Sequence, residues 1–409
     1  MNNNKENDSG KVVSFVLFGG TGDLVKRKLA PAFADLVARK VLSKRSKIVG
    51  VGRKQMSDDE YKKILVDSIE GNLKKEIECL EVNYVSADFS NPSEVGKIGE
   101  SLKHCDITGC NRIYYLSTGF KFFPSIVEGL KRHGLDKEKK GFTRIVFEKP
   151  FGSGLKNSNE LDKAIHNVFN EENVFRIDHY LAKEAVKELV NLKLNDKKFN
   201  GVLNSKNVAE IQIVSDEDLG VGERLEYYNE SGALKDMVQN HLLQLLSITL
   251  ANFKNKKEMH DKKVEILNKL KVVNSKENLI GQYNSYSQEL NKKELRDVRR
   301  ETFVNITLEC KDDNWKGVKL ILRTGKMLGK KESYIKINFK DGKEKIFSIY
   351  PGKKGLDEYS FLLENAVNGD KEYFASDLEI KECWRIVEDI EKMKDKIRFV
   401  RYEDNKIPF

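Results

Sequence analysis

Residues 12–24 read Val12-Val13-Ser14-Phe15-Val16-Leu17-Phe18-Gly19-Gly20-Thr21-Gly22-Asp23-Leu24. The first seven residues are mostly apolar, which is typical of a buried parallel strand. The glycines that follow let the backbone turn sharply and approach a phosphate, which the N-terminus of a helix expected from about residue 23 to 40 would hold. Because the spacing is not the usual G-x-G-x-x-G, a tight turn without ligand is the alternative.

Strands and helices continue to alternate to about residue 175. We predict further strands at residues 47–52, 82–87, 112–116 and 144–147, and a helix that opens at Ser57. This pattern predicts an α/β Rossmann-type N-terminal domain over residues 11–177, preceded by a polar, disordered N-terminus at residues 1–10.

The second half of the chain has a different pattern. Alternating strands are expected at residues 208–214, 302–309, 318–323, 334–339 and 345–350. Helices are expected at residues 234–250, 254–271 and 377–394. We therefore predict an α+β C-terminal domain with a mostly antiparallel sheet over residues 178–409, which would bind substrate and form a dimer contact.

Composition narrows the classes of function. With 409 residues, 39% hydrophobic and 33% charged, two or three globular domains are expected. The chain has a net charge of +9 but no basic tract with interleaved aromatic residues, so we expect no nucleic-acid partner. No run of about 18 apolar residues occurs, so we expect no membrane contact. The five cysteines have no metal or disulfide spacing, which favours free thiols, no metal and a cytoplasmic location.

The end of the second expected strand bears on the choice of dinucleotide. An acidic residue there would bind the ribose 2′-hydroxyl of NAD, but this chain has Arg53 and Lys54. A guanidinium group suits a 2′-phosphate, so we expect NADP. The alternative is a surface arginine in a charged loop.

Three further motifs concentrate reactive side chains. Residues 176–184 read Arg-Ile-Asp-His-Tyr-Leu-Ala-Lys-Glu, which suits a site that binds an anion and moves a proton. Residues 148–152 read Glu-Lys-Pro-Phe-Gly at a strand end, where ligands of parallel sheets bind and a cis Lys149–Pro150 bond is possible. Residues 236–242 place His241 in a polar setting on a helix.

Together these motifs resemble the glucose-6-phosphate dehydrogenase family. The family reads R-I-D-H-Y-L-G-K-E, E-K-P-F-G, D-x-x-Q-N-H-L-L-Q and, at residues 19–31, G-A-S-G-D-L-x-x-R-K-L-x-P; in the first, Ala182 replaces a Gly. The resemblance implies oxidation of D-glucose 6-phosphate to 6-phospho-D-glucono-1,5-lactone with reduction of NADP, the first step of the oxidative pentose phosphate pathway of glucose metabolism.

The resemblance also implies roles for residues. His241 would be the general base and Asp178 would orient it. The 6-phosphate would be held by His179, Tyr180, Lys183 and Lys331, with Tyr180 and Lys183 on one helix face if the helix has begun. The sugar would be contacted by Lys149, Glu217, Asp236 and Lys326. NADP would be held by Gly19, Gly20, Thr21, Gly22, Asp23, Leu24, Arg53 and Lys149.

The chain departs from the family pattern in two regions. Ser117-Thr118-Gly119 follows the 112–116 strand where the family usually has Leu-Pro-Pro. After Tyr350 the chain lacks several tens of residues that the family normally has, including strands of the large sheet. We therefore expect a trimmed sheet, no structural second NADP, and a homodimer formed through the remaining strands.

Two other functions stay open at this point. One is a different sugar dehydrogenase with the Glu-Lys-Pro motif that acts on unphosphorylated sugar, which the predicted phosphate group of His179, Tyr180 and Lys183 opposes. The other is an inactive NADP-binding regulator, which the presence of both Asp178 and His241 opposes.

Overall fold

The computed structural model describes residues 9–108, 111–296, 299–351, 355 and 357–408. The chain forms two compact units. The first comprises Met1–Gly152, Lys156–His179 and Leu356–Phe374, and the second comprises Ser153–Leu155, Tyr180–Gly355 and Ala375–Phe409. The division at His179/Tyr180 lies two residues beyond the expected boundary.

The first unit is built on a six-stranded parallel sheet in the order β3-β2-β1-β4-β5-β6. The strands are β1 (Val13–Phe18), β2 (Lys47–Gly52), β3 (Glu81–Ser86), β4 (Asn111–Leu116), β5 (Thr143–Phe147) and β6 (Val174–Arg176). This confirms the predicted Rossmann-type fold. The strand order reverses between β1 and β4, and in such sheets ligands bind at that reversal, beyond the carboxyl ends of the strands.

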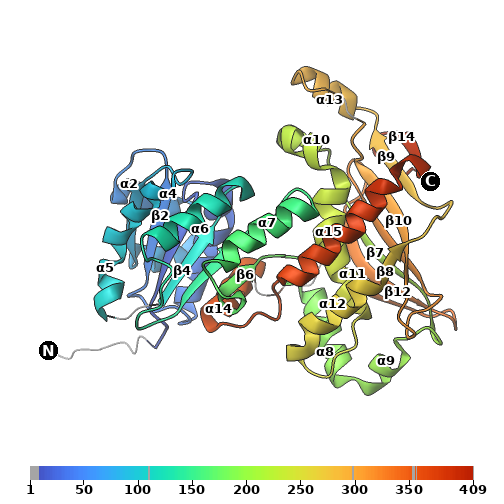
Figure 1. The fold of residues 1–409 in the computed structure, drawn as a ribbon, viewed down its shortest axis with the longest axis horizontal. Coiled ribbons are helices and arrows are strands. Elements are labelled where there is room, and N and C mark those ends of the chain that lie inside the picture. The colour runs from blue at the N-terminus through green and yellow to red at the C-terminus, as the bar shows by residue number, and fades with distance from the viewer. Residues whose placement is uncertain (1–8, 109–110, 297–298, 352–354, 356, 409) are drawn as a thin grey trace. The chain divides into compact units, whose positions relative to one another are not determined.

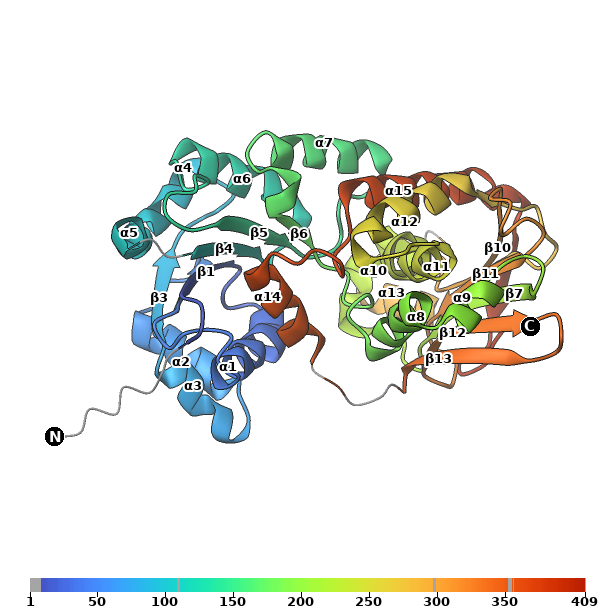
Figure 2. The ribbon, with the colours of Figure 1, turned by 90° about the horizontal axis from the view of Figure 1, so that it is seen from below.

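Helices cover both faces of this sheet (Figure 2). On one face lie η1 (Val25–Leu29), α1 (Ala30–Ala38), α2 (Asp58–Asp67), α3 (Lys74–Glu78) and α14 (Glu358–Asn368). On the other lie α4 (Pro92–Val95), α5 (Gly99–Thr108), α6 (Phe123–Arg132) and α7 (Leu155–His166). Short 3₁₀ turns complete the unit at Gly71–Leu73, Gly96–Ile98, Phe120–Phe122 and Glu171–Asn173. As expected, Ser57 opens a helix: it forms a capping box with Glu60 at the start of α2.

Helix α14 returns to the first unit, although the sequence analysis places residues 178–409 together. Glu364 forms an ion pair at 2.7 Å with Arg39, the residue that caps the C-terminal end of α1. Arg144 on β5 donates to the carbonyl of Ala366 at 2.7 Å, near the helix C-terminus. Cations placed at the final carbonyls stabilise a helix end, so these contacts tie α14 to the sheet.

The second unit contains an eight-stranded sheet in the order β13-β12-β7-β11-β10-β9-β14, with β8 paired to β10. The strands are β7 (Val208–Asp216), β8 (Leu270–Val272), β9 (Leu279–Tyr283), β10 (Phe303–Cys310), β11 (Lys319–Gly325), β12 (Glu332–Phe339), β13 (Glu344–Tyr350) and β14 (Arg398–Tyr402). Among the strands that the structure describes in this sheet, only the β7–β11 and β9–β14 pairs are parallel. The predicted, mostly antiparallel sheet is therefore confirmed, while β8, β9 and β14 were not foreseen.

Several helices of the second unit lie beside the sheet, and others lie at its ends (Figure 1). They are α8 (Glu184–Asn195), α9 (Lys197–Val202), α10 (Leu225–Ala233), η7 (Leu234–Leu242), α11 (Leu243–Leu250), α12 (Met259–Lys269), α13 (Tyr286–Lys292) and α15 (Asp377–Lys392), with short turns at Gly222–Arg224, Lys256–Glu258 and Lys394–Lys396. Every residue of α11 is buried, so it is the centre of the hydrophobic core.

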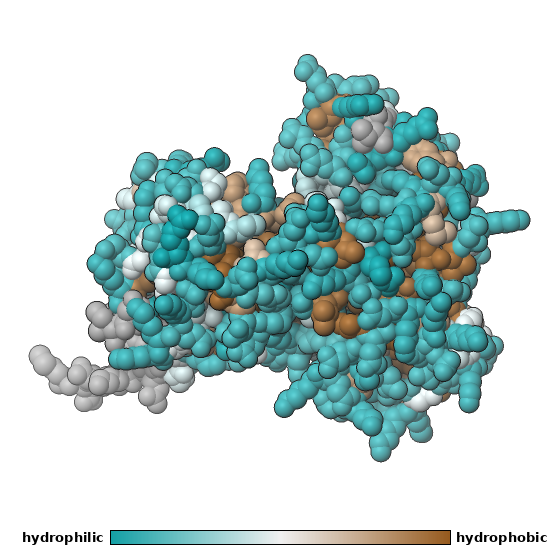
Figure 3. Space-filling model, in the orientation of Figure 1, coloured by the Kyte–Doolittle hydropathy of each residue, from teal (hydrophilic) through white to brown (hydrophobic). Residues whose placement is uncertain are grey.

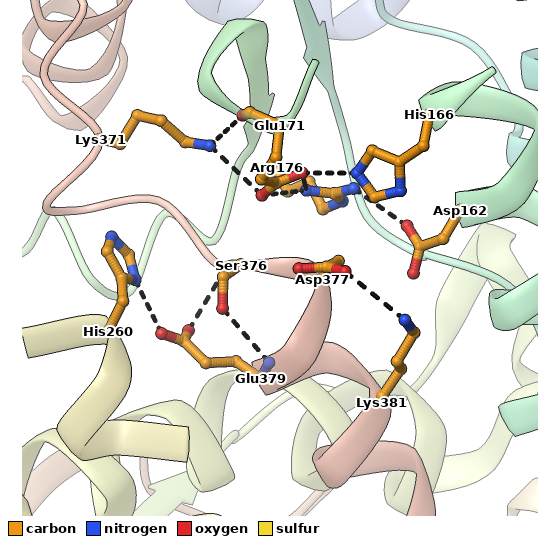
Figure 4. Close-up of polar contacts among 10 residues, drawn as sticks. All are labelled: Asp162, His166, Glu171, Arg176, His260, Lys371, Ser376, Asp377, Glu379 and Lys381. Carbon is orange, nitrogen blue, oxygen red and sulfur yellow. Dashed lines mark hydrogen bonds and ion pairs between the residues drawn. The ribbon is translucent and has the colours of Figure 1, made fainter. Parts of the chain in front are cut away.

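Each unit encloses a network of buried charges (Figure 4). In the first unit, the Arg176 guanidinium is 1% exposed and contacts Asp162 at 3.0 Å and Glu171 at 2.8 Å. In the second, the carboxylate of Glu379 is completely buried between His260 and Lys263, each at 2.8 Å. Arg176, although it opens the 176–184 motif, is therefore a structural cation.

The exterior is mostly hydrophilic on the face seen in Figure 3, as the high charged content implies. Among the described residues, no helix is both long enough and apolar enough to cross a membrane.

Candidate active site

The glycine turn at Gly19–Leu24 is shaped by close contact with the ends of neighbouring strands. The N–H groups of Gly19 and Gly20 donate to the Val51 carbonyl at 2.9 and 3.0 Å. Gly19 has φ +84°, and a Cβ there would lie 2.7 Å from the Ser117 carbonyl oxygen. Only glycine fits this position, because the conformation and the space both exclude a side chain.

Two of the predicted motifs lie beside or within π-helical turns. Residues Val25–Leu29, directly after the glycine turn, form η1, and Leu234–Leu242, which includes His241, form η7. Such turns are rare and occur frequently at functional sites. The expected helices at residues 23–40 and 234–250 are present, and each contains this wider turn in its first part.

Arg53 lies just past the end of β2 with an exposed side chain, as does Lys54. Asp88, beyond β3, is close enough for the charge of Arg53 to act on it. The pKa of Asp88 is lowered first by hydrogen bonds from Ser90, and the positive charge of Arg53 adds to this. The carboxyl ends of β2 and β3 therefore present an accessible guanidinium group beside the glycine turn.

Lys149 and Asp178 leave the sheet side by side. Phe147, the last residue of β5, pairs with Arg176, the last residue of β6, and the Ile177 N–H donates to the Phe147 carbonyl at 2.9 Å. The Lys149–Pro150 bond is cis, as the sequence allowed. Asp178 is only 2% exposed. The first unit thus brings together Lys149, Asp178 and the adjoining His179, which is half-buried.

His241 is buried in the second unit, 1% exposed on η7. The Tyr180 ring stacks on the imidazole with a centroid separation of 4.1 Å and an interplanar angle of 16°. The Tyr180 hydroxyl lies 3.1 Å from Ser215 Oγ on β7. The ring of Tyr180 therefore fixes one face of the imidazole, while its hydroxyl is tied to the sheet.

Predicted sugar-binding residues gather around Tyr228, which the sequence analysis did not single out. Lys326, 8% exposed, forms an ion pair with Glu217 and lies 5.6 Å from the Tyr228 ring centroid. Burial raises the pKa of Tyr228 well above its usual value, and the negative charges of Asp236 and Glu217 add to this. Asp236, 2% exposed, also contacts Arg224 at 3.4 Å.

The cations expected at the 6-phosphate come from separate elements. Helix α8 begins only at Glu184, so Tyr180 and Lys183 do not share a helix face. They close a turn instead, in which the Lys183 N–H donates to the Tyr180 carbonyl at 3.2 Å. Lys331 is exposed just before β12, 4.4 Å from the ring of Tyr350. Lys331 and Tyr180 therefore lie in different segments of the second unit.

Several neighbours of the predicted residues gave no recognisable sequence signal. Tyr228 and Arg224 lie between the 208–214 strand and the Asp236 motif, and Tyr115 on β4 donates to Glu148 at 2.5 Å. An aromatic pair such as Tyr227-Tyr228 reads as ordinary core from sequence alone. Among the described residues, no group of three or more His, Cys, Asp or Glu could hold a metal ion.

Two family models match the chain. The model described as "Glucose-6-phosphate dehydrogenase, NAD binding domain" matches residues 16–188, and "Glucose-6-phosphate dehydrogenase, C-terminal domain" matches residues 190–355. The chain belongs to the glucose-6-phosphate dehydrogenase family. The resemblance stated from the motifs is thereby confirmed.

Relatives and solved structures agree with this assignment. The glucose-6-phosphate 1-dehydrogenase of Borreliella burgdorferi is 33% identical, covering 95% of this chain and 93% of its own length. That of Bacillus subtilis is 33% identical over 82% and 73%. A solved structure titled "Glucose-6-phosphate dehydrogenase in complex with its substrate glucose-6-phosphate" shares the fold, with a TM-score of 0.85 at 22% identity over 98% of this chain and 96% of that one.

The departures from the glucose-6-phosphate dehydrogenase pattern can be placed in the structure. Ala182 is absent from the residues with positive φ, so it replaces the family glycine without a left-handed backbone. Ser117 Oγ donates to the Phe18 carbonyl at 2.8 Å, which ties the altered loop to the end of β1. The C-terminal family model ends at residue 355, within the segment where we expect the shortening.

Proposed function

We propose that this family member is an NADP-dependent glucose-6-phosphate dehydrogenase, which converts D-glucose 6-phosphate to 6-phospho-D-glucono-1,5-lactone in the oxidative pentose phosphate pathway. The observation that carries this proposal is His241, a buried imidazole stacked on Tyr180 in the same unit as Glu217, Asp236 and Lys326. A base and polar groups suited to sugar hydroxyls are what oxidation of a hemiacetal requires.

In the proposed reaction, His241 removes the proton from the C1 hydroxyl while hydride leaves C1. Imidazole suits this role near neutral pH. NADP, when bound, accepts that hydride. Asp178 orients His241 and stabilises the imidazolium as it forms. The position of Asp178 in the chain, two residues before the Tyr180 that stacks on His241, supports this pairing.

Substrate recognition is assigned to two groups of residues. Glu217, Asp236, Lys326 and Lys149 contact the sugar hydroxyls, and the ion pair of Glu217 with Lys326 supports the first part of this set. His179, Tyr180, Lys183 and Lys331 hold the 6-phosphate. These cationic and hydroxyl groups distinguish the proposed substrate from unphosphorylated glucose.

Cofactor binding is assigned to Gly19, Gly20, Thr21, Gly22, Asp23, Leu24, Arg53 and Lys149. The glycine turn precedes a helix whose first N–H groups are available to a pyrophosphate. The exposed guanidinium of Arg53 supports NADP over NAD. The residues present therefore fit an NADP molecule.

The direct test measures reduction of the cofactor by absorbance. Glucose 6-phosphate and glucose are each tested with NADP and with NAD. Glucose 6-phosphate with NADP should give the highest kcat/KM. A preference for free glucose would instead support the other sugar dehydrogenase with the Glu-Lys-Pro motif, and no reduction with either sugar would support a regulator.

We also infer a homodimer and a cytoplasmic location. Ile346 and Tyr350 on the edge strand β13 are each 46% exposed, which supports a further chain packing on this sheet. Cys79 and Cys310 are free thiols, which supports a reducing compartment. A monomer at micromolar concentration in sedimentation would contradict the dimer.

A further inference from the structure

A carboxyl group outside the assigned machinery lies one residue from Lys149. Glu148 follows β5, and its Oε1 accepts a hydrogen bond from the Tyr115 hydroxyl at 2.5 Å. Tyr115 lies on the adjacent strand β4, where it pairs with Val146, and it is fully buried. The register of the sheet therefore fixes the donor against the residue that leads into the cis Lys149–Pro150 bond.

A second hydroxyl reaches Glu148 from the distant end of the sequence. Tyr359, in the first turn of α14, places its hydroxyl near the Glu148 carboxyl group, where it favours the ionised form. The start of α14 is held in place by Asp357, whose carboxylate accepts from the Tyr359 N–H at 3.0 Å and pairs with Lys28 at 3.4 Å. Lys28 belongs to η1, directly after the glycine turn, so α14 links this turn to the end of β5.

The groups around Glu148 shift the pKa of its carboxyl group in opposite directions. Burial raises the pKa of Glu148 to about 7, and the negative charge of Asp178 acts in the same direction. The hydroxyls of Tyr115 and Tyr359 and the charge of Lys149 oppose this. Burial raises the pKa of both tyrosines, so they stay neutral donors. Tyr115, Tyr359, Lys149 and Asp178 are thus the titratable side chains with the largest effects on the pKa of Glu148.

We propose that Glu148, held between Tyr115 and Tyr359, is a positioning residue whose carboxylate orients Lys149 and sets the charge beside Asp178. The inference rests on the proposed function, because Lys149 and Asp178 have roles there. Ionised Glu148 draws Lys149 toward the strand end and adds negative charge near the carboxylate that supports the base. Protonated Glu148 does neither.

The test compares the pH dependence of kcat/KM for glucose 6-phosphate in a set of matched variants. Glu148→Gln keeps the shape but not the charge, so it should lower kcat/KM about tenfold at alkaline pH and remove one ionisation from the acid limb. Tyr115→Phe and Tyr359→Phe each remove a donor that favours the carboxylate, so the acid limb should move up by about one pH unit. Tyr359→Phe should add nothing further in a Glu148→Gln background.

Tyr114→Phe is the control, because Tyr114 is the neighbouring residue on β4 and its hydroxyl donates to the Leu135 carbonyl at 2.7 Å instead. Its profile should coincide with wild type, and circular dichroism should show that all variants are folded. The inference is overturned if Glu148→Gln keeps the wild-type profile, or if the Tyr115 and Tyr359 variants match Tyr114→Phe. A wild-type protein that reduces no NADP with glucose 6-phosphate would overturn the proposed function itself.

Discussion

Glu148 in the first unit and Glu379 in the second have opposite electrostatic settings. Burial raises the pKa of Glu148 to about 7, whereas the charges of Lys263 and His260 lower that of Glu379 to about 2 in spite of burial. Glu379 is in direct contact with two cations, while Glu148 has neutral tyrosine donors, the charge of Lys149 and the like charge of Asp178. Burial alone therefore does not set the charge of a carboxyl group; the groups that surround the carboxyl decide whether its pKa rises or falls.

The largest expected effect separates two histidines of the second unit, one in the proposed active site and one beside Glu379. His241→Asn should lower kcat about 10³-fold, because it removes the general base, while the unfolding free energy changes little. His260→Asn is the matched control, since His260 contacts Glu379 at 2.8 Å and has no role in the proposed site. It should lower stability and leave kcat within about twofold of wild type. The prediction is contradicted if His260→Asn lowers kcat strongly while His241→Asn lowers only the stability.

Glu379→Gln should lower the unfolding free energy by about 3 kcal/mol at neutral pH, because Lys263 and His260 then lose their shared partner. The folded-state pKa of Glu379 is depressed, so its stabilisation is present above about pH 4.5 and is lost as pH falls toward about 2. Urea unfolding should therefore show wild type and variant converging in acid. A constant difference down to the acid limit would contradict the assigned pKa.

Glu148→Gln should instead raise the unfolding free energy at alkaline pH. The folded-state pKa of Glu148 is raised, so stability is lost as pH rises from about 4.5 to about 7. A neutral amide avoids this loss, and the variant should be more stable than wild type by about 2 kcal/mol at pH 8. Unfolding at two pH values measures this. A variant that is less stable than wild type at pH 8 would break the contrast with Glu379.

The smallest effect concerns the exposed Arg53. Arg53→Ala should raise the KM for NADP about tenfold and leave the KM for NAD nearly unchanged, because only NADP carries a 2′-phosphate. Initial rates with both cofactors measure the ratio. An unchanged KM for NADP would remove Arg53 from the cofactor site.

Local pattern predicted most of the fold. Continuous apolar runs identified β1 and β2, because these strands are buried on both faces. Alternation of apolar and polar residues identified strands such as β11 and β12, because they bury mainly one face. The motif residues were likewise visible, since reactive side chains cluster in short stretches. Contacts between distant segments were not visible. The sequence does not indicate that Arg176 is neutralised by Asp162, that Tyr359 returns to Glu148, or that η1 and η7 take a wider turn, because each depends on tertiary packing.

The most direct test of the central claim measures NADPH formation from glucose 6-phosphate by wild-type protein and by His241→Asn side by side. Wild type should reduce NADP rapidly and the variant about 10³-fold more slowly, with both proteins folded. Equal rates for the two proteins, or no reduction by wild type, would contradict the central claim.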